Sequence, residues 1–337
     1  MTEPDPSDLD RLTAALHVSN GDATEVPGTG LAERVIYWRD ALHEGPVPAV
    51  GADELRRTRA AFLSRHAGTD PAGTERELAE RDHTLDAARD GEYVLWFEAD
   101  LYDQLQIVQV LARLAELRVP ADRITLICIG EHPAIARFGG LGELTAAQLR
   151  ALAATNARRT LTPAALDLAT RAWAAFRAPT PSGLAAIAAT RSTDLRFLGE
   201  AFDRLGHEYP AHRDGLSLTE RRALAAVAGG APDAGTAFVR AAARETRPFL
   251  GDLWFFAIVD RLATAPHPLL DLSDRPVDQG TAVRLTRVGE RVLGGEADHV
   301  VLNGVDRWVG GVRLLGNDPG WRWDDGVEAV VGPSAGS

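Results

Sequence analysis

Acidic side chains follow four short apolar segments of the chain, and together they could hold a cation. The segment ends read Asn20-Gly21-Asp22, Arg39-Asp40, Glu98-Ala99-Asp100 and Glu131-His132. If the segments are parallel strands, their carboxyl ends meet at one edge of a sheet, where open α/β folds bind ligands. Carboxylates gathered there repel one another unless a cation, an arginine or a shared proton compensates, and oxygen ligands suit Mg²⁺ or Mn²⁺. The alternative is that they are solvated loop residues, which are common in an acidic protein.

The first segment, HVSNGDAT, runs into a tight glycine turn. We expect the backbone N–H groups of Asn20, Gly21 and Asp22, with the two polar side chains, to bind a polar substrate. The alternative is a turn that only reverses the chain, for which Asn, Asp and Gly are the usual residues.

The second segment leads into WRDALHEGPVP, which holds an indole, a guanidinium, two carboxylates and an imidazole within seven residues. His43 is the best candidate for a general acid or base, because imidazole titrates near neutrality and Glu44 or Asp40 could orient it. Trp38 and Arg39 would then contact the substrate. The alternative is a structural ion pair of Arg39 with Asp40 and a capped loop histidine.

The third segment, LWFEADLYDQLQ, passes from an apolar strand into a helix. Glu98 and Asp100 are the predicted metal ligands. Asp103 and Gln104 lie in the first helical turn, where the helix dipole favours an anionic group, so we expect them to contact substrate. The alternative is that Asp100 caps the helix and Asp103 compensates its dipole, which leaves Glu98 unexplained.

An alternation of strands and helices positions these groups and predicts an α/β domain with a mostly parallel sheet over residues 13–155. Apolar, β-branched runs predict strands at 16–19, 35–38, 93–97 and 124–129. Helical periodicity is found at 53–65, 75–89 and 101–117. Residues 1–12 are acidic and contain proline, which predicts a disordered tail.

The remaining chain predicts a helical connector over 156–212, a winged-helix-like α+β domain over 213–330 and a disordered tail over 331–337. Ser217 and Glu220 have the spacing of a capping box that opens the first of three helices. Two short strands at 269–272 and 282–285 would form the wing. The presumed recognition helix, residues 252–261, offers one arginine, whereas base readout needs several polar or basic side chains. We therefore expect this module to pack or dimerise.

Composition limits the classes of function that fit. The 337-residue chain is 45% hydrophobic and 25% charged, which are globular values, and its formal charge is −12. That charge argues against non-specific binding to nucleic acid or anionic membranes. All 36 basic residues are arginine, so phosphate loops and Schiff bases that need a lysine are excluded. Cys128 is the single cysteine, which excludes an internal disulfide and a multi-cysteine zinc site.

No basic start is followed by an apolar run, and no stretch of about 18 apolar residues occurs in the sequence. We therefore expect a cytoplasmic protein without a membrane partner.

Four segments resemble the bacterial family called domain of unknown function 1835. They are HVSNGDAT, WRDALHEGPVP, LWFEADLYDQLQ and FGGLGELTAAQL, and they cover most of the N-terminal domain. The resemblance implies a shared architecture and adds no particular reaction.

A more distant similarity is to Toprim domains, in which an acidic strand end holds Mg²⁺ for phosphoryl transfer. The matching segments here are YVLWFEAD and, further along, the Gly-Leu-Gly-Glu run at 140–143. The similarity implies that Glu98 and Asp100 are metal ligands and that Asp103 assists. The sequence departs from the Toprim pattern at Asn20, where a glutamate would be expected, and it has no strand-cleaving tyrosine that can be assigned.

These observations predict an enzyme that acts on a polar phosphorylated or nucleotide-like small molecule, as a metal-dependent hydrolase or phosphoryl transferase. Mg²⁺ or Mn²⁺ would be its cofactor. The alternative is a ligand-sensing or DNA-associated regulator that uses the winged helix. A homo-oligomer and a catalytically inert scaffold also stay open.

Overall fold

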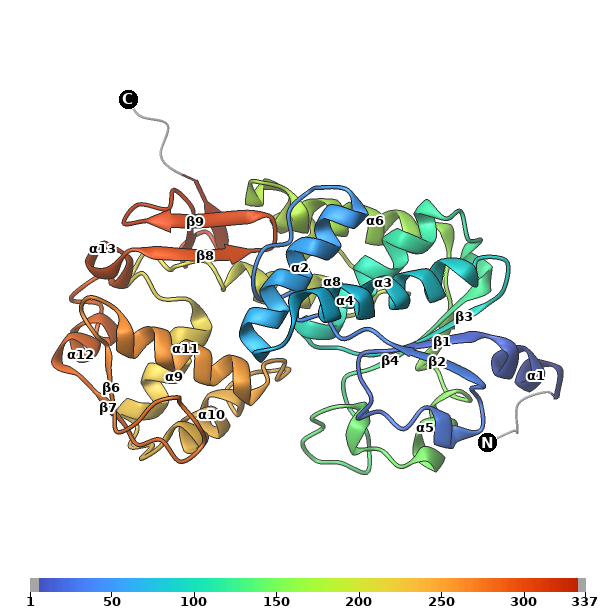
Figure 1. Ribbon diagram of the computed structural model, residues 1–337, viewed down its shortest axis with the longest axis horizontal. Helices are drawn as coiled ribbons and strands as arrows, with labels where there is room; N and C mark the ends of the chain where they lie inside the picture. The colour runs from blue at the N-terminus through green and yellow to red at the C-terminus, as the bar shows by residue number, and fades with distance from the viewer. Residues whose placement is uncertain (1–5, 333–337) are drawn as a thin grey trace.

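The computed structural model describes residues 6–332. A sheet flanked by helices occupies one half of an elongated molecule, and a smaller helical lobe occupies the other half (Figure 1). The chain therefore has mixed α/β content, as its strand and helix patterns predict.

A five-stranded sheet forms the frame of the first half. Its spatial order is β2-β1-β3-β4-β5, in which the first four strands are parallel and β5 runs antiparallel to β4. The strands are β1 (Leu16–Ser19), β2 (Arg34–Tyr37), β3 (Tyr93–Glu98), β4 (Ile124–Ile129) and β5 (Arg158–Thr160). The four parallel strands match the predicted segments to within one residue at each end. The edge strand β5 is not predicted, because its three residues, Arg-Arg-Thr, carry no apolar pattern.

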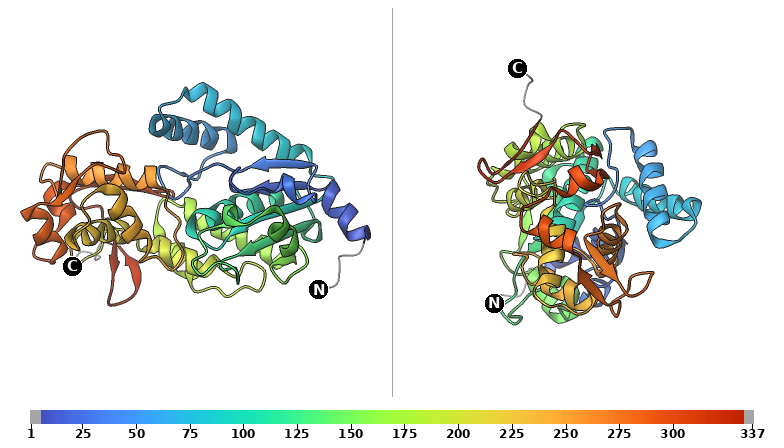
Figure 2. Two further views of the ribbon diagram at one scale, coloured as in Figure 1. Left: turned by 90° about the horizontal axis from the view of Figure 1, so that it is seen from below. Right: turned by 90° about the vertical axis from the view of Figure 1, so that its left-hand side faces the viewer.

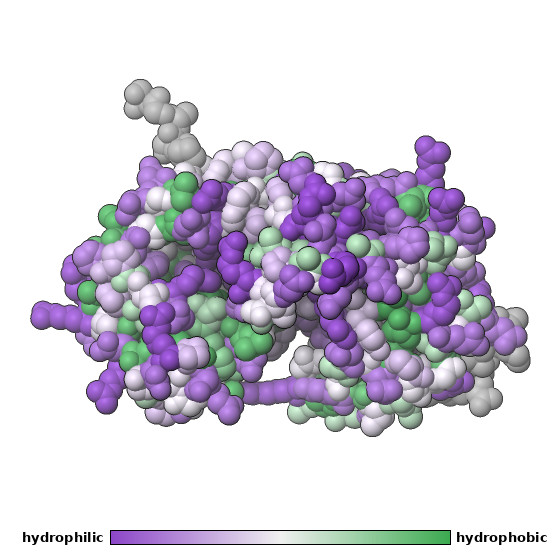
Figure 3. Space-filling model, viewed as in Figure 1, coloured by the Kyte–Doolittle hydropathy of each residue, from purple (hydrophilic) through white to green (hydrophobic). Residues whose placement is uncertain are grey.

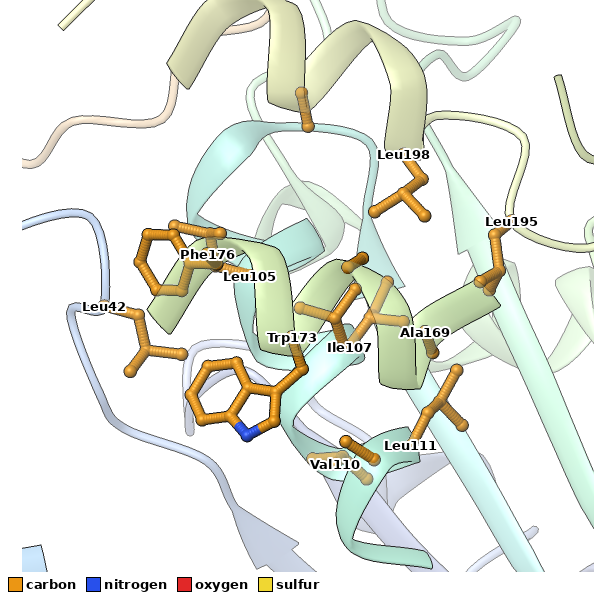
Figure 4. Close-up of a cluster of buried hydrophobic side chains, with 14 of the residues drawn as sticks. Leu42, Leu105, Ile107, Val110, Leu111, Ala169, Trp173, Phe176, Leu195 and Leu198 are labelled. Carbon is orange, nitrogen blue, oxygen red and sulfur yellow. The ribbon is translucent and has the colours of Figure 1, made fainter. Parts of the chain in front are cut away.

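Both faces of the sheet are covered, because alternate residues of the central strands enter two different cores. In β3, Leu95 and Phe97 enter the larger core with helices α4 and α6, whereas Val94 and Trp96 enter a smaller core with α5. This burial on both faces explains the continuous apolar runs of the parallel strands. Figure 4 shows the contact of α4 with α6 in the larger core, where Ile107 and Leu111 lie close to Ala169.

The first helix of this half begins before residue 13, where the sequence predicts the domain to start. The helices of this half are α1 (Pro6–Ala14), α2 (Ala52–Ala67), α3 (Pro71–Ala87), α4 (Leu101–Glu116), α5 (Ala146–Leu152), α6 (Pro163–Arg177), α7 (Leu184–Ala188) and α8 (Leu198–Gly206). The prediction of a disordered tail over 1–12 is wrong from residue 6 onward, since α1 begins there and buries Leu12 in the smaller core. Residues 1–5 lie outside the described part. Helices α2 and α3 form a hairpin that stands out from the rest of this half (Figure 2).

The second half is a lobe with its own core. It contains α9 (Leu218–Ala228), α10 (Ala234–Ala242), α11 (Asp252–Thr264), the antiparallel pair β6 (Leu270–Leu272) and β7 (Val283–Leu285), α12 (Arg287–Leu293) and α13 (His299–Asn303). The predicted capping box is confirmed, because the Ser217 hydroxyl accepts from the Glu220 N–H and the Glu220 carboxylate accepts from the Ser217 N–H.

Two final hairpins leave the lobe and return to the first half. They are β8 (Val305–Val309) with β9 (Val312–Gly316), and β10 (Arg322–Asp324) with β11 (Ala329–Val331). Val309, Leu314 and Trp323 belong to the larger core, so both hairpins pack against the first half. At the turn, Gly310 has φ 59°, and an added Cβ would lie 2.2 Å from the Phe176 carbonyl oxygen, so only glycine fits. Of the predicted C-terminal tail, residues 333–337 lie outside the described part.

Within residues 6–332, no helix combines the length and apolar character needed to cross a membrane.

Candidate metal-binding site

Three buried carboxylates, from Glu98, Asp100 and Asp103, lie together where β3 ends and α4 begins. One ligand oxygen from each of them lies within 4.8 Å of the other two. Glu98 is the last residue of β3, Asp100 is the N-cap of α4 and Asp103 lies in the first turn. We call these three residues the acidic triad.

Local backbone geometry explains why the triad is compact. The Asp100 carboxylate accepts the Asp103 N–H at 3.1 Å, which is ordinary helix capping, and the Asp103 carboxylate accepts the Glu98 N–H at the end of β3. The predicted capping role of Asp100 is therefore confirmed. It does not explain Glu98, whose side chain is buried beside the other two carboxylates.

The loop after β4 holds Glu98 from the opposite side. The Leu141 N–H donates to Glu98 Oε1 at 2.7 Å. A Cβ added to Gly140 (φ 155°) would lie 2.6 Å from Glu98 Oε2, so the loop needs glycine to approach the carboxylate this closely. These residues belong to the Gly-Leu-Gly-Glu run, which the structure thus brings against the acidic strand end.

Asn20, at the carboxyl end of β1, joins the triad. Its Nδ2 donates to Asp103 Oδ1 at 3.0 Å and to Glu98 Oε1 at 3.3 Å. Its Oδ1 accepts from Ser19 and Thr24 at 3.4 Å. Because β1 and β3 are adjacent and parallel, their carboxyl ends deliver these groups to the same edge, as the sequence predicts.

Burial and mutual repulsion raise the pKa values of the three carboxyl groups of the triad. Burial and the neighbouring Asp100 carboxylate raise the pKa of Glu98 to about 8, and burial raises the pKa of Asp100 to about 6. Burial, Asp100 and Glu98 together raise the pKa of Asp103 well above its usual value. Without a counter-charge the triad therefore retains protons near neutral pH, and a bound cation would displace them.

The donor set fits a hard divalent cation. All the triad ligands are carboxylate oxygens, which Mg²⁺ and Mn²⁺ prefer. Oxygens that bind one Mg²⁺ at about 2.1 Å lie at most about 4.2 Å apart, so the observed 4.8 Å limit requires only a small side-chain rotation.

A small cavity of about 20 Å³ opens beside the triad, with room for about one water molecule or ion. Glu98 and Asp100 line it from the sheet, Gly130 and Gly139 from the following loop, and Arg247 from the second half. Arg247 donates to the Gly130 carbonyl at 3.1 Å and pairs with Glu200. The cavity therefore lies between the two halves, and the space-filling view shows an opening between them (Figure 3).

Asp40, a predicted catalytic residue, lies elsewhere. It forms a buried ion pair with Arg59 at 2.7 Å, and each side chain is 1% exposed. Arg59 also donates to the carbonyls of Glu44, Pro46 and Ala41. The structural ion pair anticipated for Asp40 is present, with Arg59 rather than Arg39 as the partner.

His43, the predicted acid or base, is enclosed by aromatic rings. Tyr102, Phe249 and Trp254 pack edge-on against it with ring centroids 5.4–6.0 Å away. Neither ring nitrogen has a hydrogen-bond partner, and burial lowers the pKa of His43 to about 3. The structure therefore does not support an acid–base role for His43 at neutral pH, because the ring is neutral there and none of its contacts is a triad residue.

The charged groups that act on Glu44 are not those of the triad. Burial raises its pKa, and the charges that act on it belong to Arg261, Arg307, Glu208 and Glu220. It therefore does not orient His43, as the sequence had suggested it might.

The predicted substrate-binding residues divide into three groups. These are an exposed ion pair with the turn beside it, a buried tryptophan, and Asn20, Asp103 and Gln104 at the candidate site. Asp22 and Arg39 form an exposed ion pair with each other, with side chains 71% and 59% exposed, and Gly21 lies in the turn beside them, where its carbonyl accepts from Ser19. Trp38 is buried and donates to Gln109 at 2.7 Å, away from the triad.

Asp103 and Gln104 do lie at the candidate site. Asp103 belongs to the triad, and Gln104 donates from Nε2 to the Glu98 carbonyl at 2.7 Å. Gln104 therefore supports the backbone of the site. Glu131 is exposed and not part of the triad.

Sequence reasoning missed Arg247 and Gly130 as residues near the site. Arg247 lies far along the chain in a segment without a motif, so no local signal could have identified it.

A comparison of this chain with protein-family models, curated proteins and solved structures found no match to any of them.

Proposed function

We propose that this protein is a metal-dependent enzyme, a hydrolase or phosphoryl transferase that acts on a polar phosphorylated small molecule. The observation that carries the proposal is the acidic triad of Glu98, Asp100 and Asp103, three buried carboxylates within reach of one cation. Their pKa values are shifted chiefly by burial, by one another, by Asn20 and by backbone N–H groups, with no arginine among the main causes. A cation is therefore the group that would best compensate their charge.

The residues around the triad suggest how such a reaction would be arranged. A bound Mg²⁺ or Mn²⁺ would polarise a phosphoryl oxygen and offset its charge. Asn20, Gln104 and the Leu141 N–H hold the carboxylates in place. Arg247, on the far wall of the same cavity, would bind a second oxygen of the phosphoryl group with its guanidinium. The rest of the substrate would lie in the recess between the halves.

Calorimetric titration with Mn²⁺ and Mg²⁺ tests the metal site. We expect the wild type to bind one ion and Glu98→Gln and Asp100→Asn to bind it at least tenfold more weakly, because each loses one anionic ligand. The exposed Glu77 of α3 provides a control outside the site, and Glu77→Gln should bind like the wild type. Equal binding by all four proteins, or no binding by the wild type, would remove the metal from the proposal.

Phosphate release from a panel of nucleotides and sugar phosphates, measured with saturating Mg²⁺, tests the reaction. Any activity of the wild type should fall about a hundredfold in Glu98→Gln and in Arg247→Gln, since each contact stabilises charge in the transition state. Activity that survives in both variants would place the reaction elsewhere.

The similarity to Toprim domains and to the family called domain of unknown function 1835 stays part of this proposal. The contact between Leu141 and Glu98 supports the Toprim comparison, because it joins the two segments that carry it. Asn20, at the position expected for a glutamate, would bind the carboxylates and not transfer a proton.

The alternative function is a regulator that binds nucleic acid through a winged helix. The order α9, α10, α11 and the β6–β7 pair is compatible with that fold. However, Trp254 of α11 stacks on His66 of α2, with ring centroids 3.7 Å apart, so part of the presumed recognition helix is covered by the first half. We therefore prefer the enzyme.

A further inference from the structure

Two arginines lie against one phenylalanine ring at the carboxyl end of β4, which meets the carboxyl end of β3 at the edge of the sheet that holds the triad. The guanidinium carbon of Arg247 lies 4.8 Å from the centre of the Phe197 ring, and that of Arg196 lies 5.2 Å from it. Because they share this ring, the two guanidinium groups are neighbours. Arg247 lines the cavity beside the triad and Arg196 does not, so the pair offers one position at that cavity and one next to it.

Backbone carbonyls fix where the two guanidinium groups lie. Arg196 Nη2 donates to the Cys128 carbonyl at 2.9 Å, and Arg247 Nη1 donates to the Gly130 carbonyl at 3.1 Å. A Cβ added to Gly130 would collide with the Arg247 guanidinium, so glycine leaves the space that Arg247 occupies. Stacking on an aromatic ring also holds a guanidinium in a defined orientation. Both arginines are therefore positioned before a ligand binds, which lowers the entropic cost of binding.

Both arginines keep accessible hydrogen-bond donors. Arg196 is exposed, and the side chain of Arg247 is 25% exposed. Within residues 6–332, the hydrogen bonds of the Arg196 side chain engage Nη2 alone, and those of Arg247 engage Nε and Nη1. The remaining N–H groups, on Nε and Nη1 of Arg196 and on Nη2 of Arg247, can donate to oxygens of a ligand.

Positive charge exceeds negative charge around the shared ring. Glu200, which pairs with Arg247, is the carboxylate that the described part of the chain places on these two arginines. Helix α8 begins after Phe197, its N-cap, and no side chain caps it, so the positive end of the helix dipole lies at the same place. The nearby triad retains protons near neutral pH or binds a cation, which offsets much of its charge. These features favour an anionic ligand.

We propose that Arg247 and Arg196 bind two neighbouring phosphate groups of one ligand, so that the substrate of the proposed enzyme is a diphosphate ester. The first phosphate lies at the triad cavity and accepts from Arg247. The second lies next to it and accepts from Arg196, which makes Arg196 the residue that distinguishes a diphosphate from a monophosphate. The inference rests on the proposed function, since that function places the first phosphate at the triad.

Calorimetric titration of the full chain tests the arginine pair with two probes. Methylenediphosphonate mimics a diphosphate and is not hydrolysed, and methylphosphonate mimics a single phosphate. In saturating Mg²⁺ we expect the wild type to bind methylenediphosphonate about tenfold more tightly than methylphosphonate, because a second charge-assisted contact forms. Arg196→Gln should weaken the binding of methylenediphosphonate about tenfold and leave that of methylphosphonate unchanged. Arg76, an exposed arginine of α3, is the matched control, and Arg76→Gln should bind both probes like the wild type.

The same titration in EDTA separates this inference from the proposed function. A preference for methylenediphosphonate that disappears in Arg196→Gln supports the arginine pair as a diphosphate site, even where the metal titration shows no bound ion. Equal affinity of the wild type for the two probes, no saturable binding of methylenediphosphonate, or a preference that persists in Arg196→Gln would overturn the inference. None of these three results changes the outcome of the metal titration. Circular dichroism of each variant confirms that it is folded.

Discussion

At pH 8 and without divalent cations, Asp103→Asn is expected to raise the free energy of unfolding, because burial and the neighbouring carboxylates of Asp100 and Glu98 raise the pKa of Asp103 and make its ionisation costly. The substitution removes one of three charges that are buried together. Asparagine keeps one oxygen, in the place of Oδ2, that can accept from the Glu98 N–H and from Asn20 Nδ2, while its amide nitrogen replaces the Oδ1 acceptor and loses the second Asn20 contact. We expect the relief of repulsion to outweigh this one lost hydrogen bond.

The dependence on pH follows from the same cause. Because the pKa of Glu98 rises from 4.5 to about 8 on folding, the folded state holds more protons than the unfolded state between these values. The contribution of Glu98 to the stability should therefore fall as the pH rises from about 4.5 to about 8, whereas buried histidines such as His43, whose pKa is lowered, contribute a stability that rises with pH up to about 6.5. Urea unfolding at pH 6.5 and 8, above the range in which the histidines act, measures the fall, which should be smaller in Asp103→Asn.

Mg²⁺ should reverse the order of the two proteins. It stabilises the ionised triad, so the wild type gains stability at pH 8 and Asp103→Asn gains less. Asp22→Asn, which changes an exposed carboxylate, should behave like the wild type in every condition. A change in stability between pH 6.5 and 8 that is equal in the wild type and in Asp103→Asn would show that the triad is not under electrostatic strain.

The second large effect is expected at the buried pair of Asp40 and Arg59. Asp40→Asn should lower the free energy of unfolding by about 3–5 kcal/mol, because it leaves the Arg59 charge buried without a counter-charge. The three carbonyl oxygens that accept from Arg59 satisfy its hydrogen bonds and not its charge. Equilibrium unfolding in urea measures the loss.

An exposed pair in the same region gives the control. Arg39→Gln should cost less than about 1 kcal/mol, since Arg39 and Asp22 are both solvated. The double variant Asp40→Asn with Arg59→Met should recover part of the loss, because it removes the unpaired charge as well. If Asp40→Asn lowers the free energy of unfolding no more than Arg39→Gln does, the buried pair of Asp40 and Arg59 does not stabilise this region electrostatically.

The sequence by itself determined most of the sheet and part of the candidate site. Apolar runs predict the four parallel strands, of which β1, β3 and β4 are fully buried, and hydrogen-bonding caps such as Ser217 mark where helices begin. Parallel strands in neighbouring positions must end at one edge, so Asn20 and Glu98 could be expected to meet. These features depend on the backbone and on residues close together in the chain.

The tertiary structure alone decided which side chains became partners. Asp40 pairs with Arg59 and not with its neighbour Arg39, because α2 places Arg59 beside the segment that follows β2. His43 is enclosed by Tyr102, Phe249 and Trp254, and Arg247 reaches Gly130 from the second half. Such contacts join segments that are far apart in the chain, and their formation depends on how whole helices pack. Local residue patterns do not specify that packing. A carboxylate predicted to be catalytic can therefore turn out to be one partner of a structural ion pair.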